Sequence, residues 1–368
     1  MNETILIWLV FILAFGGMVL IHEFGHFIVA RLCKIEVEEF GIGLPTPGAL
    51  TLFTWQGTRF TLNWLPLGGF VRPKGENDPT IPGGLAAASP WARLAVLFAG
   101  PLMNLLTAVL IYSIIFNQVG VPDTNRVLIS SVTPDGPAAQ AGFQGGDILI
   151  SGNDRPIHNF DELRAIVDAN ENKPVVFLVD RKGQQVELTV TPRLNDKEKR
   201  IMIGVSLGVP FRSANSFTET LDLGARYAYL NIRTLISLPA QMLRGTLAPE
   251  QGRLIGLKGI YDVFEQTVSH DVQATTSAPV SADPIDQPIR TLDLIASLSI
   301  SLGIFNLFPF PALDGGRILF VLPELIFRRR VPHRFENLVH GMGMALLLMF
   351  MIYVNVMDFV NPVNITIP

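Results

Sequence analysis

Two histidines with a glutamate between them lie in the first apolar segment of the chain, in the order His22-Glu23-Phe24-Gly25-His26. Residues four apart on a helix share one face, so both imidazoles can bind one metal ion. Glu23 lies close to the same face, where it can act as general base on a water molecule that the metal activates. The spacing therefore predicts hydrolysis assisted by Zn²⁺. Ionisable groups inside an apolar segment are energetically costly and usually functional.

A third zinc ligand has to be a histidine or a carboxylate, because the chain has a single cysteine. Asp314, in the sequence ALDGG, directly follows the third apolar segment. His22 lies 17 residues after Ile5, which is about 25 Å along a helix that enters a hydrocarbon core about 30 Å thick. Both sites are thus expected near the inner side of the membrane. A His₂–carboxylate set leaves one zinc position open.

The composition is that of a membrane protein. Hydrophobic residues make up 49% of the chain and charged residues 16%, which is too apolar for a typical soluble protein. The net charge of −4 provides no basic field, so no nucleic-acid partner is expected. The first 20 residues contain no Lys or Arg, which favours a retained membrane span over a signal peptide that is removed.

Four apolar stretches are long enough to cross a membrane, namely 5–30, 91–116, 292–310 and 337–360. The loops after the first and third stretches are basic and contain Arg31, Lys34, Arg59, Arg72, Lys74 and Arg93, and Arg317, Arg328, Arg329, Arg330 and Arg334. Because basic loops stay in the cytoplasm, both termini and the central segment are expected outside. The fold class predicted is a polytopic α-helical membrane protein with four transmembrane helices.

The segments between these stretches have different patterns. Residues 35–90 combine aromatic, Thr and β-branched residues with Gly and Pro, which predicts hairpins in a membrane-associated β region. An edge strand there can hold a substrate in extended form by strand addition. Residues 125–208 alternate short strands and helices, as in a small α+β domain. Residues 213–290 predict an amphipathic helix, which Pro239 kinks or divides, and then a polar loop.

Together these motifs resemble the site-two protease family of intramembrane zinc metalloproteases, specifically the bacterial regulator-of-sigma-E protease type. The resemblance covers nearly the whole chain. It rests on the run from His22 to His26, Asn63-Trp64 with Gly68-Gly69, the run from Phe98 to Asn104, Asn306, and the run from Pro309 to Gly316. The central segment resembles one bacterial PDZ domain, through Gly136-Pro137-Ala138-Ala139 and Gly146-Asp147-Ile148-Leu149.

The resemblance implies that His22, His26 and Asp314 bind Zn²⁺ and that Glu23 is the catalytic base. Asn104 and Asn306 occupy positions that the family places near the active site, where they could hydrogen-bond the substrate backbone; interhelical hydrogen bonding is the alternative. The implied activity is regulated intramembrane proteolysis of single-span proteins, such as anti-sigma factors or remnant signal peptides. It takes place among the lipids of the bacterial inner membrane. The PDZ domain would bind a peptide or substrate tail outside.

The predicted organisation runs, by residue number, through a first transmembrane helix (1–34), a β region (35–90), a second transmembrane helix (91–118), a PDZ domain (125–208), an amphipathic helix with a polar loop (213–290), a third transmembrane helix (291–311), a cytoplasmic loop with LDGG (312–335) and a fourth transmembrane helix (336–361). Two alternatives are a non-catalytic adaptor that relies on its PDZ domain and a transporter with a metal site. The intact Glu23 argues against the adaptor, and the spans show no paired broken helices of the transporter kind.

Overall fold

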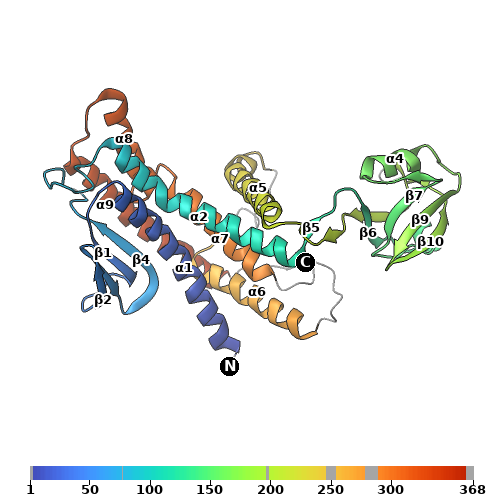
Figure 1. Ribbon diagram of the computed structural model, residues 1–368, viewed down its shortest axis with the longest axis horizontal. Helices are drawn as coiled ribbons and strands as arrows, with labels where there is room; N and C mark the ends of the chain where they lie inside the picture. The colour runs from blue at the N-terminus through green and yellow to red at the C-terminus, as the bar shows by residue number, and fades with distance from the viewer. Residues whose placement is uncertain (1–2, 77, 196–198, 246–253, 278–288, 362–368) are drawn as a thin grey trace. The chain divides into compact units, whose positions relative to one another are not determined.

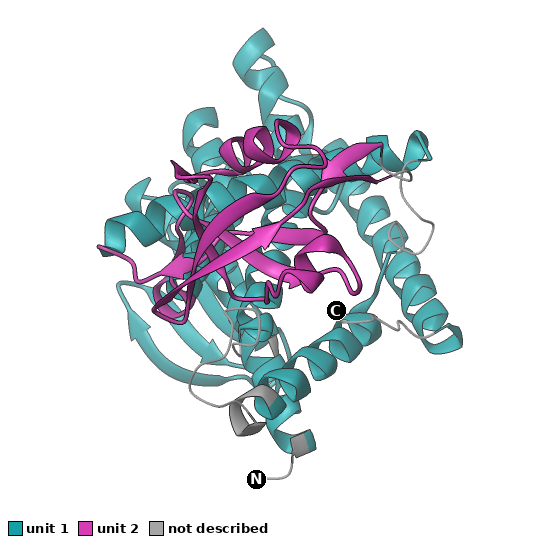
Figure 2. Ribbon diagram, turned by 90° about the vertical axis from the view of Figure 1, so that its right-hand side faces the viewer, with its two compact units in different colours: residues 1–116, 216–368 teal, residues 117–215 magenta. Residues whose placement is uncertain are grey.

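The chain forms two compact units in a computed structural model that describes residues 3–76, 78–195, 199–245, 254–277 and 289–361 (Figures 1 and 2). The first unit combines residues 1–116 with 216–368, and the second consists of residues 117–215. The second unit is thus an insertion into the first.

The first unit is mainly helical, with α1 (Glu3–Leu32), α2 (Pro90–Val119), α5 (Phe217–Leu243), α6 (Leu257–Ser277), α7 (Arg290–Asn306), α8 (Asp314–Phe327) and α9 (His333–Val360) (Figure 1). Three of these helices, α1, α2 and α9, are long and apolar enough to cross a membrane. At 1.5 Å per residue a 30-residue helix such as α1 measures about 45 Å, more than the hydrocarbon thickness of about 30 Å. The membrane helices predicted from these three stretches are therefore supported.

The third predicted span is shorter than expected. Helix α7 has 17 residues and ends at Asn306, whereas the sequence predicted a helix that reaches residue 311. Pro309 and Pro311 explain the difference, because proline has no backbone N–H and disfavours helical conformation in the residue before it. At about 25 Å, α7 lies at the lower limit for a span. A fourth span stays a prediction.

The structure also adds detail to three predictions about segments of the first unit. The predicted cytoplasmic loop 312–335 contains helix α8, which starts at Asp314. The polar loop was predicted for 270–287, but residues 270–277 belong to helix α6; residues 278–288 lie outside the described residues. Pro239 lies inside α5 without dividing it. Helix α8 forms because its apolar side packs on α2, through Leu94, Leu97, Ile318 and Val321.

A four-stranded sheet follows α1, as the hairpin pattern predicted. Its strands are β1 (Val37–Leu44), β2 (Leu50–Trp55), β3 (Thr58–Leu62) and β4 (Leu65–Pro73), in the order β2-β3-β1-β4. Gln56 and Gly57 both have positive φ (47° and 84°), so they form the two-residue turn that suits a hairpin. Edge strand β4 lies along α1, and Gly68 and Gly69 carry no Cβ where α1 approaches.

The second unit is a small α+β domain. Its elements are β5 (Val121–Pro122), β6 (Val127–Val132), α3 (Pro137–Gln140), β7 (Ile148–Gly152), β8 (Arg155–Pro156), α4 (Phe160–Asp168), β9 (Val175–Arg181), β10 (Gln184–Val190), β11 (Arg193–Asn195), β12 (Arg200–Met202), β13 (Val205–Gly208) and β14 (Phe211–Arg212). Strands β10, β9, β7, β6 and β13 adjoin in that order. The core contains Ile129, Phe177 and Val179, which are fully buried. This unit therefore has a hydrophobic core of its own.

Candidate metal centre and active site

The two histidines lie one turn apart on α1, and both side chains are buried. His26 Nδ1 lies 2.7 Å from the carbonyl oxygen of Val96 in α2. A carbonyl can only accept, so His26 Nδ1 carries the proton and its Nε2 presents a lone pair. His22 Nδ1 instead faces the side-chain amide of Asn104, whose Nδ2 is 3.3 Å away. The Nε2 atoms of the two rings are 3.1 Å apart.

Two glycines allow α2 to approach the histidines. A Cβ atom on Gly100 would collide with His26 Nε2 and would lie 2.8 Å from His22 Nε2. A Cβ atom on Gly25 would collide with the carbonyl oxygen of Ala99. The backbones of α1 and α2 therefore lie close together at Gly25 and Gly100. The missing side chain of Gly100 leaves room beside the imidazole nitrogens.

A tight turn between α7 and α8 brings Asp314 to the histidines. Cβ atoms on Gly315 and Gly316 would collide with backbone carbonyls of the same turn. Ala312 adopts a positive φ of 82°, which is strained for a residue with a side chain. Its N–H donates to Nδ1 of His340 in α9 at 2.9 Å. His340 thus supports the Asp314 turn, a role that no local sequence pattern indicated.

The structure brings the three predicted ligands together. Asp314 Oδ2 lies 3.1 Å from His22 Nε2 and 3.3 Å from His26 Nε2, and all three ligand atoms lie within 4.8 Å of one another. Ligands about 2.0 Å from a tetrahedral zinc ion would be about 3.3 Å apart. These atoms therefore have the spacing and chemistry of three corners of a zinc tetrahedron.

The protonation state of Asp314 also suits a ligand. Burial raises the pKa of this carboxyl, but hydrogen bonds from His22 and His26, and the positive charge of these rings when they are protonated, lower it more, to well below its usual value. The group is therefore a carboxylate at neutral pH, as metal binding requires.

Glu23 faces the same cavity as the ligand cluster. The cavity has a volume of about 460 Å³, and its lining includes His22, Glu23, His26, Phe70, Val71, Asn306 and Asp314. Glu23 Oε2 accepts a hydrogen bond of 3.1 Å from the backbone N–H of Val71 in β4. A base, a candidate metal site and a sheet edge therefore meet in one space. Asn306 lines that space, whereas Asn104 is fully buried behind His22.

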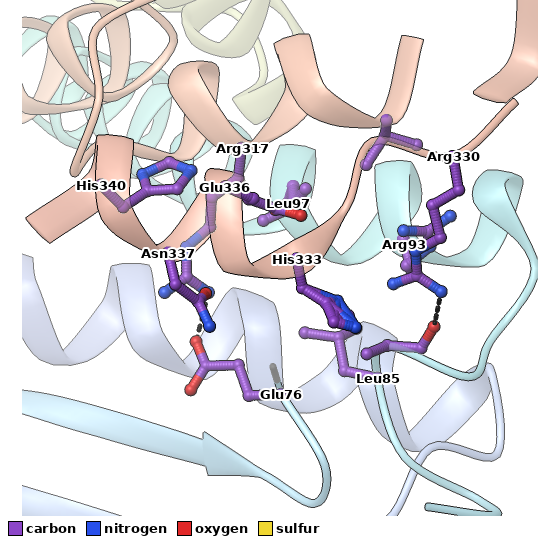
Figure 3. A pocket seen from close by; sticks show the side chains of 12 residues that line it. Glu76, Leu85, Arg93, Leu97, Arg317, Arg330, His333, Glu336, Asn337 and His340 are labelled. Atoms are coloured by element: carbon purple, nitrogen blue, oxygen red, sulfur yellow. Dashed lines mark hydrogen bonds and ion pairs between the residues drawn. The ribbon is translucent and has the colours of Figure 1, made fainter. Parts of the chain in front are cut away.

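A second cavity of about 230 Å³ adjoins the first and shares Glu76 and Arg317 with it. These two side chains form an ion pair where the cavities meet (Figure 3). Arg93, also in the lining, pairs with Glu324. The arginines Arg93 and Arg317 of the second cavity are thus each paired with a glutamate, while the ligand cluster opens onto the first cavity.

Comparison with known proteins agrees with this geometry. The model for peptidase family M50 matches residues 10–350. This chain belongs to that family. Metalloprotease MmpA of Caulobacter vibrioides is 30% identical to this M50 peptidase, over 95% of this chain and 93% of its own length. The family confirms the predicted resemblance to a membrane protease of the site-two type.

Two further relatives are each 30% identical to this chain and carry the name "Putative zinc metalloprotease". The one from Clostridium perfringens matches over 96% of this chain and 98% of its own length. The one from Campylobacter jejuni matches over 94% and 91%. A PDZ domain of the SdrC-like protein from Listeria monocytogenes, a solved structure, covers 23% of this chain and 87% of its own at 19% identity and a TM-score of 0.21.

Proposed function

We propose that this M50 peptidase is a zinc endopeptidase that cleaves single-span membrane proteins within the bilayer or at its edge. One observation carries the proposal: ligand atoms of His22, His26 and Asp314 converge in a cavity that Glu23 also lines. The names of the relatives from Clostridium perfringens and Campylobacter jejuni support zinc as the metal.

In the proposed mechanism, the Nε2 atoms of His22 and His26 and a carboxylate oxygen of Asp314 hold the zinc ion. When bound, zinc supplies Lewis acidity, which makes water more acidic and polarises the scissile carbonyl. Glu23 takes a proton from the attacking water on its carboxylate and delivers it to the nitrogen of the leaving amine. The hydrogen bond from Val71 N–H orients that carboxylate toward the cavity.

Strand β4 is the element that we expect to align the substrate. It is an edge strand of the sheet, and its residues Phe70 and Val71 line the cavity with Glu23. A substrate segment must unwind before cleavage, because a helix uses its own backbone N–H and C=O groups internally. An extended segment can pair with a free strand edge through its backbone. Asn306, in the same lining, is proposed to hydrogen-bond that backbone.

The membrane arrangement that we propose has four spans, with α7 as the third between α2 and α9. The basic loops then lie in the cytoplasm, and both termini and the second unit lie outside the bacterial inner membrane. The active site would be near the cytoplasmic face. Anti-sigma-factor-like proteins and remnant signal peptides are the substrate classes proposed.

The second unit is proposed to act as a PDZ domain that selects substrates by a peptide tail. It contains a groove of about 640 Å³ between α4 and the β12–β13 segment, lined by apolar residues that include Leu163, Val167, Ile203 and Val205. A peptide could add to strand β13 there while its side chains enter the groove.

A Glu23→Gln variant tests the catalytic proposal. General bases contribute about 10²–10⁴-fold to rate, so cleavage of a reporter with one membrane span should fall by about that factor. Zinc content should be unchanged, because Gln keeps the shape and does not alter a proposed ligand. Glu38→Gln is the matched control, since Glu38 is exposed on β1. Purified protein and reporter in proteoliposomes allow both measurements.

The two readouts separate the possible results. Loss of cleavage with full zinc content supports the roles given to Glu23 and the ligands. Undiminished cleavage by Glu23→Gln would contradict the mechanism and favour the adaptor.

A further inference from the structure

The two histidines have different partners on their outward-facing nitrogens. His26 Nδ1 donates to the carbonyl oxygen of Val96, and that bond leaves Nε2 free to bind metal. His22 has no backbone carbonyl in the equivalent place. Its Nδ1 faces the amide group of Asn104 at 3.3 Å. The outward-facing nitrogens of the two rings are therefore held by different groups.

A neutral imidazole that binds metal through Nε2 carries its proton on Nδ1, and that N–H needs an acceptor. The Oδ1 atom of Asn104 is buried and has no hydrogen-bond partner. Rotation of the amide by 180° exchanges Oδ1 and Nδ2 without changing the shape of the side chain. After that rotation Oδ1 takes the place of Nδ2 beside His22 Nδ1.

We propose that Asn104 is a positioning residue for His22: its side-chain oxygen accepts the Nδ1 proton and so fixes the ring in the form that binds zinc. The inference rests on the proposed function, because it assumes that His22 is a metal ligand. It assigns Asn104 to the metal centre in place of the predicted contact with substrate.

The surroundings of Asn104 support this role. The residue is fully buried, so a substrate in the cavity cannot reach its amide. Its backbone carbonyl accepts a 2.8 Å hydrogen bond from the hydroxyl of Ser299 in α7. A Cβ atom on Gly303 of α7 would lie 2.9 Å from the carbonyl oxygen of Pro101. Helix α7 therefore holds the α2 turn that contains Asn104, and with it the position of the amide.

The amide suits a site that must exist both with and without metal. In the orientation of the structure, Nδ2 donates to Nδ1, so His22 Nε2 carries a proton and can donate it to Asp314 Oδ2, 3.1 Å away. In the rotated orientation, Oδ1 accepts from Nδ1 and Nε2 is free for zinc. A carboxylate at position 104 could do only the second of these.

The experiment compares zinc affinity in Asn104→Leu, Asn104→Asp and Asn306→Leu. Full-length protein in detergent is titrated with zinc against a chelator of known affinity, and cleavage kinetics are measured in parallel. Loss of a partner of a ligating histidine costs about 10–100-fold in metal affinity, so Asn104→Leu should weaken zinc binding by that factor. Excess zinc should then restore much of its kcat. Asn104→Asp keeps an acceptor and should bind zinc at least as tightly as the wild type.

Asn306→Leu is the matched control, because Asn306 lines the cavity without contacting either histidine. It should raise KM and leave zinc affinity unchanged. The inference is overturned if Asn104→Leu raises KM and leaves zinc affinity unchanged, as expected for Asn306→Leu. It is also overturned if Asn104→Asp loses as much zinc affinity as Asn104→Leu. If Asn104→Leu does not fold, the zinc affinity of Asn104→Asp alone tests the inference. A wild type that binds no zinc would refute the proposed function itself, and with it this inference.

Discussion

Two carboxylates, one in each unit, have partners of different kinds; the Asp147 side chain is fully buried and the Asp314 side chain is 17% exposed. Asp147 in the second unit is fully buried and faces Arg181, whose Nε and Nη2 atoms donate to its two oxygens at 2.7 and 2.8 Å. The backbone N–H of Gln144 adds a third hydrogen bond. Asp314 in the first unit faces two imidazole nitrogens that have no fixed positive charge.

The difference is what we expect if Asp147 is structural and Asp314 binds the proposed metal. A buried charge is tolerated when it is paired and hydrogen-bonded by the protein. Asp147 meets that condition, because Arg181 and the backbone N–H of Gln144, both in the second unit, are its partners. The nitrogen atoms of His22 and His26 instead lie within hydrogen-bond distance of Asp314 Oδ2 and of each other, an arrangement in which a bound cation would take the place of a proton. The following variants test this contrast.

Asp314→Asn should give the largest effect, and it should fall on metal binding. Amides bind zinc far more weakly than carboxylates, and loss of a ligand costs more than the 10–100-fold seen for outer partners. We expect zinc affinity to fall by more than about 100-fold and cleavage to become undetectable at ordinary zinc concentrations. Chelator competition and reporter cleavage measure both. Retention of tight zinc binding would remove Asp314 from the proposed ligand set.

Gly100→Ala should weaken the same site through shape alone. The new methyl group would press on the imidazole nitrogens of His22 and His26, so the rings must move to accommodate it. We expect zinc affinity to fall by about 10-fold or more, by analogy with loss of an outer partner. Gly17→Ala in α1 is the control, because nothing lies within 4 Å of a Cβ there. Equal zinc affinity in both variants would show that the rings adjust freely.

Asp147→Asn should have the opposite effect to the two variants above. It should lower the stability of the second unit and leave zinc affinity unchanged. It leaves the Arg181 guanidinium without its negative partner. Breaking a buried ion pair costs about 3–5 kcal/mol, and the lower value applies because the Arg181 side chain is 25% exposed. About 3 kcal/mol corresponds to more than a 100-fold rise in local opening. Hydrogen exchange across residues 117–215 measures it. If Asp147→Asn lost zinc affinity while its hydrogen exchange stayed unchanged, the structural role given to Asp147 would be contradicted.

The sequence predicted what depends on local spacing. The four-residue separation of His22 and His26 within an apolar segment, together with the position of Asp314 directly after another apolar segment, predicted these residues as candidate metal ligands. The hairpins of the sheet after α1 follow in the same way from a local pattern of residues. The sequence did not predict the length of α7, because the apolar stretch continues to Phe310 whereas the helix ends at Asn306. Nor could it pair Ala312 with His340 or Asn104 with His22, since these contacts depend on how separate helices pack.

A third carboxylate, Glu162 in α4, extends the comparison to a side chain that is 44% exposed, and its effect should be the smallest. Its Oε2 accepts from the backbone N–H of His158 at 2.7 Å and lies 3.3 Å from the His158 ring. These interactions hold the pKa of Glu162 below its usual value of 4.5. A group whose pKa is lower in the folded state than in the unfolded state stabilises the unit above the unfolded pKa, and this stabilisation is lost as pH falls through the folded pKa.

Glu162→Gln keeps an acceptor for His158 N–H but cannot titrate, so the stability of the second unit should depend less on pH below about 4.5. Thermal unfolding of both proteins from pH 6 to pH 3 tests this, and parallel curves would show that the charge of Glu162 contributes nothing.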